Sequence, residues 1–586
     1  MVRDVRQAIG SHITFLPAPD FVQLIGRVPS ANELELGRLL FNDTILSRNN
    51  DTSCATCHLS NHGFADGNSL SVGALGRGGA DSTNVGRKFA TGTLQLERGF
   101  GTDSLGFVND QFMFRNTLST INVAYRMNAA ENSGLLHDGR FGDLFFQVLL
   151  PIHTPEELCG RNPIPDGVRT PNPFAPKSQL FVKPVKIYHA HSFDPVNGQD
   201  LGSFNAVEST VAGVPSRRPD GSMAIPTRNE CLAIAVAKVR SVPAYRDLIK
   251  RVYGDDEVSD RHIGRAIATF IMTHVAIDTP FDRFIKGDDS ALTSAQLRGL
   301  AAFHMPLGQS APIDGVTVRG AGCSGCHAGP EFGGHGFASL GVRSDRRSTQ
   351  SRPANIADTS SGFFSRRHIQ RGLVPACHVK SVSVTDASGI PYAPDIGRAN
   401  ATYKDEDCFK FRIPPLRNVL ETYPYFHHGT ARGQGNSTVG LEALAYTSLK
   451  EVIRYHLRGP QDAETAARLN FTKPYFDDLY QFDPMIPFFR QTFRPERPLD
   501  NSVFPYTVTE TAVEDLAQFI AYGLRDPAAT SRGALGNDVS HPTRVLSGFH
   551  PAITRDDGTQ LELPPNAEPL PMINDQLSAT DPQSMR

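Results

Sequence analysis

The sequence predicts a mainly α fold that long irregular insertions interrupt. Apolar residues recur at helical spacing in three segments, residues 32–41, 229–253 and 261–275. A period near 3.6 residues is typical of helices that bury one face. Two stretches, residues 161–228 and 342–407, instead have weak periodicity and many Pro, Gly and Ser residues. We interpret both as insertions on a helical scaffold, each able to carry short hairpins.

Local signals support each of these elements in turn. The first helix opens at Ser30 or Asn32, because both residue types are good N-caps. A chain of 586 residues is long for one hydrophobic core and predicts two or more domains. Residues 531–586 are rich in Pro, Asn and Asp, so we expect a loosely packed irregular tail. Apart from two short cysteine motifs, we expect no internal repeat.

Two pentapeptides of the form Cys-x-x-Cys-His, at residues 54–58 and 323–327, give the clearest chemical signal. The two thiols of each can bond the vinyl groups of a porphyrin, and the adjacent imidazole can ligate its iron. Random placement of 8 Cys and 19 His would give roughly 0.004 such pentapeptides. Zinc is the alternative, but widely separated pairs, each followed by His, favour haem. The motifs predict two covalently bound haem c groups, held by Cys54, Cys57, Cys323 and Cys326, with His58 and His327 as iron ligands.

Composition excludes several classes of partner. The 58 basic and 61 acidic residues give a net charge of -3, so the chain has no excess of positive charge that would attract nucleic acid. No run of about 18 apolar residues is present, so we expect no membrane span. Residues 1–10 lack the basic start and apolar stretch of a signal peptide, although covalent haem attachment normally follows export. We therefore expect a periplasmic protein whose leader has been removed.

Four cysteines lie outside the two motifs, at positions 159, 231, 377 and 408. An even number in an oxidising compartment allows three pairings. Cys159 with Cys231 and Cys377 with Cys408 would close the shortest loops, and four reduced buried thiols are the alternative.

Short sequence blocks lie in a fixed order around the two haem motifs. They are residues 36–41, 115–117, 122–124, 138–140, 279–284, 287–288, 296–300, 415–419 and 424–427. In this order they resemble the bacterial dihaem cytochrome c peroxidases and their MauG-type relatives. The resemblance covers most of the chain outside the insertions.

The resemblance implies two cytochrome c-like helical domains, each holding one haem, with a calcium ion between them. We expect the amino-terminal, peroxidatic haem domain to span residues 1–278, with the first insertion at about 161–228. The carboxy-terminal, electron-transfer haem domain would span residues 279–530, with the second insertion at about 342–407. The tail, residues 531–586, follows.

At the first haem, His58 would be the proximal ligand and the opposite face would receive hydrogen peroxide. Cleavage of the oxygen–oxygen bond needs a group that moves a proton between the two oxygens. The family places a Gln and a Glu there, and the matching positions are Gln147 and Glu157. Glu157 has a second reading, since Thr154 and Pro155 before it predict a helix start with Glu157 closing a capping box. The two roles are compatible.

Some relatives block the resting peroxidatic haem with a His in the loop after the first motif. Here the loop from Leu59 to Gly79 contains only His62, which lies too close to His58 to fold over the opposite face. We therefore expect an open first haem, as in the MauG-type members.

The second haem is expected to be closed and six-coordinate, and to act as an electron relay. The family draws its second iron ligand from a later helix, which corresponds to residues 448–457. Ser448 and Glu451 would form a capping box, and His456 lies on the apolar face of this helix. His456 is the expected ligand, and Tyr455, which lies off that face, is the MauG-like alternative. Two imidazole ligands would give a low-spin haem of comparatively low potential.

The main departure from the family lies between the haems. The family usually has a Trp before Asp-Gly-Arg, but this chain has His137 there and contains no Trp. Electron sharing through this position is therefore open. His137 is either a polar or proton-transferring residue near Arg140, which could contact a haem propionate, or a structural residue.

For calcium, the family uses an Asn side chain and two carbonyl oxygens, a donor set that suits a hard cation. The matching residues are Asn116, Thr422 and Pro424. Ordinary turn residues are the alternative, because carbonyl ligands leave little side-chain signature. The tripeptide His427-His428-Gly429 is left unassigned.

Three functions follow from this pattern. The first is a peroxidase-type oxidoreductase that reduces hydrogen peroxide at the open first haem and exchanges electrons or oxidising equivalents through the second. The second is a dihaem oxygenase of the rubber-cleaving type, in which the insertions shape a pocket for an organic substrate. The third is a non-enzymatic electron-transfer subunit. A small redox protein or a protein substrate would donate electrons, and the oligomeric state is open, a homodimer being one option.

Overall fold

The computed structural model describes most of the chain outside the insertions and the tail. The described residues are 1–10, 13–48, 50, 52–68, 71, 115–127, 134–159, 183–193, 200–213, 219–221, 226–334, 336–340, 342, 395–431, 440–458, 509–529 and 545–547. Much of both predicted insertions and of the predicted tail lies outside these residues.

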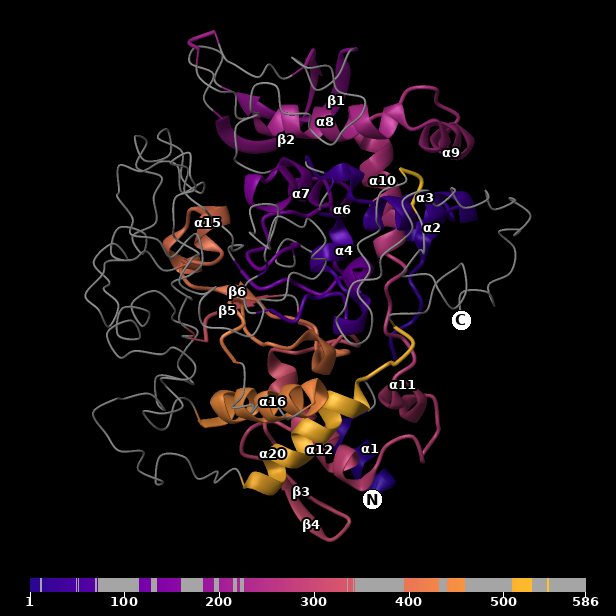
Figure 1. Ribbon diagram of the computed structural model, residues 1–586. Coiled ribbons are helices and arrows are strands. Elements are labelled where there is room, and N and C mark those ends of the chain that lie inside the picture. The colour runs from indigo at the N-terminus through magenta and orange to yellow at the C-terminus, as the bar shows by residue number, and fades with distance from the viewer. Residues whose placement is uncertain are drawn as a thin grey trace.

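Helices dominate the described residues, as the mainly α prediction required (Figure 1). The longer helices are α1 (Val2–Ile9), α3 (Ala31–Asn42), α8 (Arg228–Ser241), α9 (Pro243–Tyr253), α10 (Asp260–Ile271), α12 (Ser294–His304), α16 (Leu441–Arg458) and α20 (Glu510–Gln518). The shorter ones are α2 (Phe21–Ile25), α4 (Cys54–Cys57), α6 (Leu144–Gln147), α7 (Leu150–His153), α11 (Pro280–Ile285) and α15 (Ala399–Thr402). None of the described helices is both long and apolar enough to cross a bilayer.

The strands form antiparallel two-stranded sheets. These are β1 (Val185–Phe193) with β2 (Asp200–Val211), β3 (Ser310–Ile313) with β4 (Val316–Arg319), and β5 (Phe337–Ala338) with β6 (Phe411–Arg412). The β1–β2 hairpin lies in the first predicted insertion, where a short hairpin was expected. β5 and β6 join segments on either side of the second insertion.

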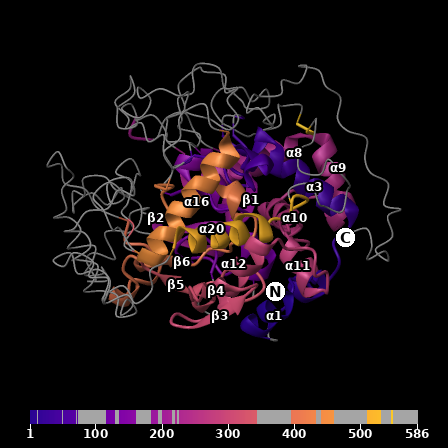
Figure 2. The same cartoon turned by 90° about the horizontal axis from the view of Figure 1, so that it is seen from below.

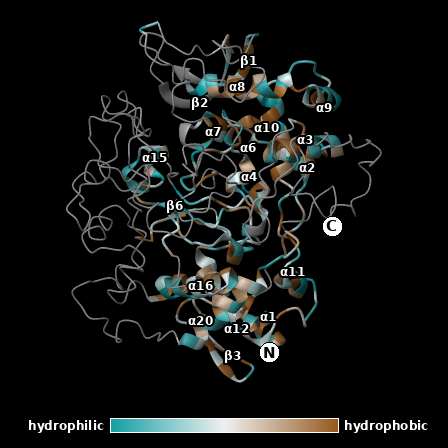
Figure 3. Ribbon diagram, viewed as in Figure 1, coloured by the Kyte–Doolittle hydropathy of each residue, from teal (hydrophilic) through white to brown (hydrophobic). Residues whose placement is uncertain are grey.

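Buried apolar side chains form two clusters, one beside each haem motif. The first cluster contains residues of α3, α8, α9 and α10 and packs against Cys54. The second contains residues of α1, α11, α12, α16 and α20 and packs against Cys323. The two groups of helices lie at opposite ends of the view in Figure 1, and Figure 3 shows brown, hydrophobic stretches along α8 and α10. The expected domain boundaries stay a prediction.

Each cluster contains one close crossing of two helices. In the first, α3 crosses α10, and a Cβ at Gly37 would lie far inside van der Waals contact with the carbonyl oxygen of Ala266. In the second, α12 crosses α20, and a Cβ at Gly299 would meet the carbonyl oxygen of Asp515 in the same way. Only glycine allows backbones to approach so closely. Figure 2 shows α16 running across α20 in this second group.

A loop motif is also repeated between the two halves. Asn122 and Asn418 both have a left-handed backbone, with φ of 62° and 57°, and each precedes a short 3-10 helix, η4 (Val123–Arg126) or η10 (Val419–Thr422). Two loops closed by antiparallel bridges follow these helices, Leu135 with Phe141 and Tyr425 with Ala431. The prediction that no repeat exists beyond the haem motifs is therefore wrong, because the backbone shows one.

Two predicted helices differ from the observed ones, and one predicted helix start is confirmed. The segment 229–253 is two helices, because Val242 is extended where it precedes Pro243. The predicted helix start at Ser30 is confirmed, since its hydroxyl accepts a bond from the Glu33 amide. The predicted capping box at Ser448 is wrong: α16 begins at Leu441, and the Ser448 hydroxyl donates to the carbonyl of Ala431.

One predicted disulfide is confirmed, because Cys159 is bonded to Cys231. Cys408 is also disulfide-bonded. Cys377 lies outside the described residues, so its predicted pairing with Cys408 stays a prediction. None of the four cysteines of the haem motifs takes part in a disulfide, which is compatible with covalent haem attachment. Of the predicted tail, residues 545–547 are described, and Val545 and Leu546 are buried in the first cluster.

Candidate active site

The first haem motif lies on a short helix that its own polar residues hold in place. α4 carries both thiols, and Ser53 and Thr56 form a capping box around its start. The motif ends at His58, whose Nδ1 donates to the carbonyl of Phe64 at 2.9 Å. A ring fixed through Nδ1 leaves Nε2 as the nitrogen that can ligate iron, which is the usual arrangement of a metal-binding imidazole. Burial lowers the pKa of His58, so the neutral, ligating form is favoured.

The second haem motif has the same local design. His327 Nδ1 lies 3.2 Å from the carbonyl oxygens of both Phe332 and Pro414. Burial, and after it the charge of His456, lower the pKa of His327 to about 4. Each motif therefore presents two thiols outside any disulfide and a neutral imidazole oriented by a backbone carbonyl, and these residues fit a covalently bound haem.

The predicted distal carboxyl, Glu157, lies near the first haem motif. It belongs to a single π-helical turn, η5 (Pro155–Cys159), which packs against α7. Burial raises the pKa of Glu157 to about 7, although Arg228 and Arg140 act in the opposite direction. Burial and the Glu157 charge together raise the pKa of the Cys54 thiol to about 12. A carboxyl group that titrates near neutral pH therefore lies within electrostatic range of the first haem cysteine.

The other reading of Glu157, as a helix cap, receives little support from the hydrogen bonds. The amide of Glu157 donates to the backbone carbonyl of Thr154, whereas the Thr154 hydroxyl donates to the carbonyl of Leu150. The Thr154 side chain thus closes the preceding helix. Gln147, the other predicted distal residue, ends α6 and is half-buried. α7 packs against both α6 and η5, so the two distal candidates come from adjoining turns.

A buried charge network runs from the first haem site towards the second half of the chain. Arg115 donates to Asp138 at 2.8 Å and, through two nitrogens, to Asp395 at 2.6 and 2.9 Å. Arg140 pairs with both oxygens of Asp138, including the oxygen that Arg115 binds. Burial alone would raise the pKa of both carboxyls, yet the guanidinium groups outweigh it and both pKa values lie below the ordinary value. Two cations thus balance two anions within this network.

His137, which occupies the position of the family's Trp, lies next to this network. Its Nε2 donates to the carbonyl of Asn116 at 2.9 Å. Burial and then the charge of Arg115 lower its pKa to about 3, so the ring is neutral at neutral pH. The structure places Arg140 against Asp138, and its predicted contact with a haem propionate stays a prediction.

His456 and Tyr455 face different surroundings on α16. The Nδ1 of His456 donates to the carbonyl of Val452 at 2.8 Å. The charge of the His456 ring lowers the pKa of His327. Tyr455 is fully buried, and its hydroxyl donates to the carbonyl of Leu340. His456 thus has the same fixed Nδ1 as the two motif histidines, whereas the oxygen of Tyr455 is engaged elsewhere.

Two of the three predicted calcium ligands meet in the structure. The side-chain amide of Asn116 lies 3.1 Å from the carbonyl oxygen of Pro424 and 3.0 Å from that of Asn68. Thr422 lies two residues before Pro424, and its hydroxyl donates to Val419, which leaves its carbonyl as the predicted ligand group. Because the oxygen and nitrogen of an amide are assigned by the hydrogen bonds alone, a flipped Asn116 would turn its oxygen to the same place. Oxygen donors of this kind suit Ca²⁺.

A further buried histidine near the first haem motif, His274, was not predicted from the sequence. Its ring stacks on Phe64 with centroids 3.8 Å apart, and its Nδ1 lies 2.7 Å from the hydroxyl of Thr120. The carbonyl of the same Phe64 accepts the bond from His58. Burial and His58 lower the pKa of His274 to about 3. A single His within an apolar segment was the only signal in the sequence, and it carries no chemistry by itself.

His62, the one His in the loop after the first motif, is buried within the first turn of that loop. Gly67 packs against its ring, since a Cβ there would lie 2.9 Å from His62 Cε1. Much of the rest of the loop lies outside the described residues, and the open first haem stays a prediction.

Comparison with known proteins agrees with the motifs. The profile of the di-haem cytochrome c peroxidases matches residues 31–172 and 202–290. The cytochrome c551 peroxidase of Nitrosomonas europaea is 23% identical over 69% of this chain and 70% of that protein. The cytochrome c551 peroxidase of Pseudomonas aeruginosa is 26% identical over 71% of this chain and 73% of that protein. The methylamine utilization protein MauG of Methylorubrum extorquens is 23% identical over 54% of this chain and 56% of that protein.

A helix-rich chain with two Cys-x-x-Cys-His sites and these relatives is a peroxidase-type oxidoreductase of the c-type cytochromes. The profile match and these relatives support a place in the dihaem cytochrome c peroxidase and MauG family.

Proposed function

We propose that the protein reduces hydrogen peroxide at a haem held by Cys54, Cys57 and His58, with Glu157 as the acid–base group. One observation carries this proposal: a buried carboxyl with a pKa of about 7 lies within electrostatic range of Cys54. A haem iron bound there would supply the redox chemistry of peroxide cleavage. The protein itself would bind peroxide beside Glu157, and Glu157 would move a proton from one peroxide oxygen to the other.

The pKa of Glu157 suits this task. A group that accepts a proton from one peroxide oxygen and returns it to the other works best when its pKa lies near the operating pH. Arg228 and Arg140 favour the ionised form and partly offset the effect of burial. Gln147, on the adjoining turn, would orient the peroxide by hydrogen bonding.

The second haem is proposed as a closed electron relay with His327 and His456 as its two iron ligands. The electrostatic influence of His456 on His327 and the fixed Nδ1 of each ring support this assignment over Tyr455. His137 and Arg140 would act between the two haem sites as a neutral polar group and as a charge paired with Asp138. Electrons would come from a small redox protein or from a protein substrate.

Calcium and the periplasm complete the proposal. Asn116, Thr422 and Pro424 would hold one Ca²⁺ at the junction of the two halves. The confirmed disulfide between Cys159 and Cys231 and the two covalent haem sites both fit an oxidising compartment.

The proposal is tested on the full-length protein with both haems by rapid mixing with peroxide. Glu157→Gln should lower the second-order rate by about 10² or more, because the variant cannot accept a proton. Glu257→Gln, at an exposed position, is the matched control and should react normally. An unchanged rate in a Glu157→Gln protein with a normal haem spectrum would leave Glu157 only a structural role. Oxygen uptake on an organic substrate without peroxide consumption would favour the oxygenase alternative.

A further inference from the structure

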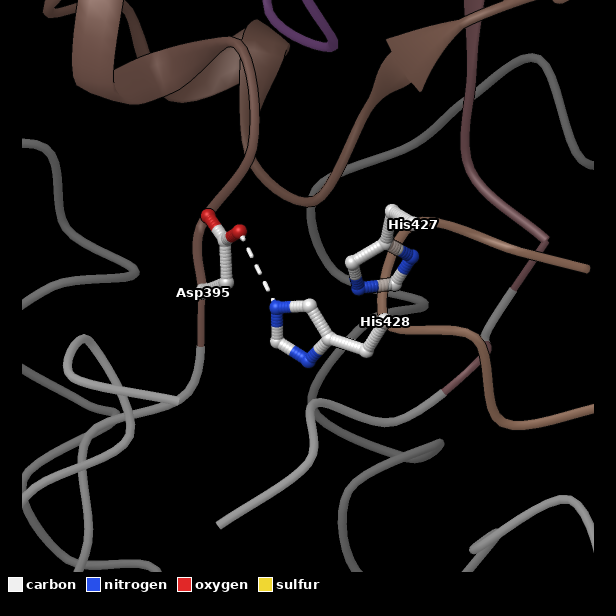
Figure 4. Close-up of side chains that lie close together, drawn as sticks. All are labelled: Asp395, His427 and His428. Atoms are coloured by element: carbon white, nitrogen blue, oxygen red, sulfur yellow. Dashed lines mark ion pairs between the residues drawn. The ribbon is translucent and has the colours of Figure 1, made fainter. Parts of the chain in front are cut away.

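Three buried side chains that the haem sites do not use converge on one point. They are Asp395, just before α15, and His427 and His428, in the loop after η10. Their ligand atoms all lie within 4.8 Å of one another, and the three side chains face one another in Figure 4. Asp395 and His428 are fully buried, and His427 is 7% exposed. Nε2 of His427 has no hydrogen-bond partner among the described residues, which is unusual for a buried nitrogen.

The distance between Asp395 and His428 suits two ligands of one ion better than it suits a hydrogen bond. Asp395 Oδ2 lies 3.5 Å from His428 Nε2, whereas a good N–H···O bond measures about 2.9 Å. Two tetrahedral zinc ligands, each about 2.1 Å from the metal, lie about 3.4 Å apart. An ion could therefore lie between this oxygen and this nitrogen with little movement of either side chain.

Charge balance does not require the two imidazoles. Asp395 is already paired with Arg115, whose remaining donor binds Asp138, and Asp138 is paired with Arg140. This network of two cations and two anions is neutral without any contribution from His427 or His428.

We propose that Asp395, His427 and His428 bind one divalent transition metal of the zinc class, with water in the fourth position. Two imidazoles and one carboxylate are an established ligand set for tetrahedral zinc. Nitrogen donors favour zinc or copper over calcium, so this site is chemically distinct from the all-oxygen group around Asn116. The proposal is independent of the peroxidase function.

Surrounding groups already hold two of the three ligands in place. Asp395 Oδ1 accepts bonds from the amide of Gly397 at 2.9 Å and from the side chain of Asn400 at 3.1 Å. The ring of His427 stacks on Phe411 with centroids 3.7 Å apart. Such outer contacts orient metal ligands and account for much of the affinity of natural sites. A metal here would join the segment before α15 to the loop at His427, whose carbonyl accepts from Asn116.

The test uses the full-length protein with both haems, freed of loose metal by dialysis against a chelator. Zn²⁺ is added at micromolar concentration, and the bound metal is counted after equilibrium dialysis by elemental analysis. We expect one Zn²⁺ per chain and a higher thermal midpoint with Zn²⁺ than without it. His428→Asn and His427→Phe should each weaken binding by more than about 100-fold. His427→Phe keeps an aromatic ring stacked on Phe411, so this variant should still fold. A normal haem spectrum would show that it does.

A matched control comes from a histidine–aspartate pair that belongs to no group of three possible metal ligands among the described residues. Nε2 of the part-buried His262 lies 3.6 Å from Oδ2 of the exposed Asp255, and His262→Asn should leave the count at one Zn²⁺ per chain. Absence of bound Zn²⁺ in the wild-type protein would overturn the proposal without any variant. Unchanged Zn²⁺ binding in His427→Phe would also overturn the proposal. The three side chains would then have only a structural role beside Arg115.

Discussion

The carboxyl group of Glu157 lies within electrostatic range of the thiol of Cys54, beside the first haem motif. Burial and this carboxylate raise the pKa of the thiol to about 12, and burial raises the pKa of Glu157 itself to about 7. The two residues are far apart in the sequence and come within electrostatic range because η5 packs against α7 and α8 and adds Leu158 to the first cluster. A carboxyl group whose pKa lies near neutral pH is thus close to the first haem motif, as the proposed acid–base role of Glu157 requires.

The first prediction concerns pH. Glu157 accepts a proton only when it is ionised, and its raised pKa keeps it mostly protonated below about pH 7. The rate of reaction with peroxide should therefore rise as the pH increases through about 7 and then level off. In Glu157→Gln the rate should be about 10² lower and should lose this inflection. Stopped-flow rates measured across the range check this, and an inflection that persists in the variant would refute the assignment.

The second prediction concerns the ligands of the second haem. His456→Leu should convert this haem from low-spin to high-spin, because the variant removes the second imidazole. Tyr455→Phe is the matched variant on the same helix turn and should keep the low-spin signal, since its hydroxyl is bonded to Leu340. Electron paramagnetic resonance distinguishes the two. A low-spin signal that survives His456→Leu but not Tyr455→Phe would favour the MauG-like ligand.

The third prediction concerns calcium. Asn116→Ala should lower calcium affinity by about 10- to 100-fold, because it removes the only side-chain ligand of the proposed site. Asn116→Asp keeps an oxygen donor and should retain binding. Calcium content after dialysis measures both, with added Ca²⁺ raising the thermal midpoint of the wild-type protein. Equal calcium retention in Asn116→Ala and the wild-type protein would reduce Asn116 to a turn residue.

The fourth prediction concerns the helix crossing that supports the first haem motif. Gly37→Ala should destabilise the protein by about 2–3 kcal/mol or more, because a Cβ there would overlap the carbonyl oxygen of Ala266. Gly142→Ala is the control, since nothing lies within 4 Å of a Cβ at that position. Denaturant unfolding with both haems bound measures the difference. Equal stability of the two variants would show that α3 can move away from α10 without cost.

Local sequence patterns predicted part of the structure well. The haem motifs, the mainly α fold, the cap at Ser30 and the Cys159–Cys231 disulfide each depend on short spacings or on loop closure. The break between α8 and α9 was missed because apolar spacing continues across Pro243. The start of α16 was placed too late because Ser448 has the residue type of a cap, yet it lies inside the helix.

The long-range features could not be predicted. Arg115, Asp138 and Asp395 come from three separate segments, and nothing in their sequence spacing indicates that they pair. The repeated helix crossing could not be predicted from the sequence. Gly37 and Gly299 each lie against a backbone carbonyl of the crossing helix, but the sequences around them differ. His427 and His428 were noticed, but only the fold brings Asp395 to them.

The central claim is one reactive haem beside Glu157 and one closed haem between His327 and His456. Electron paramagnetic resonance of the resting protein, followed by titration with peroxide, tests it most directly. We predict one high-spin and one low-spin ferric signal at rest, with the high-spin signal lost on addition of about one equivalent of peroxide. Two low-spin signals that peroxide leaves unchanged would contradict the account and would indicate an electron carrier.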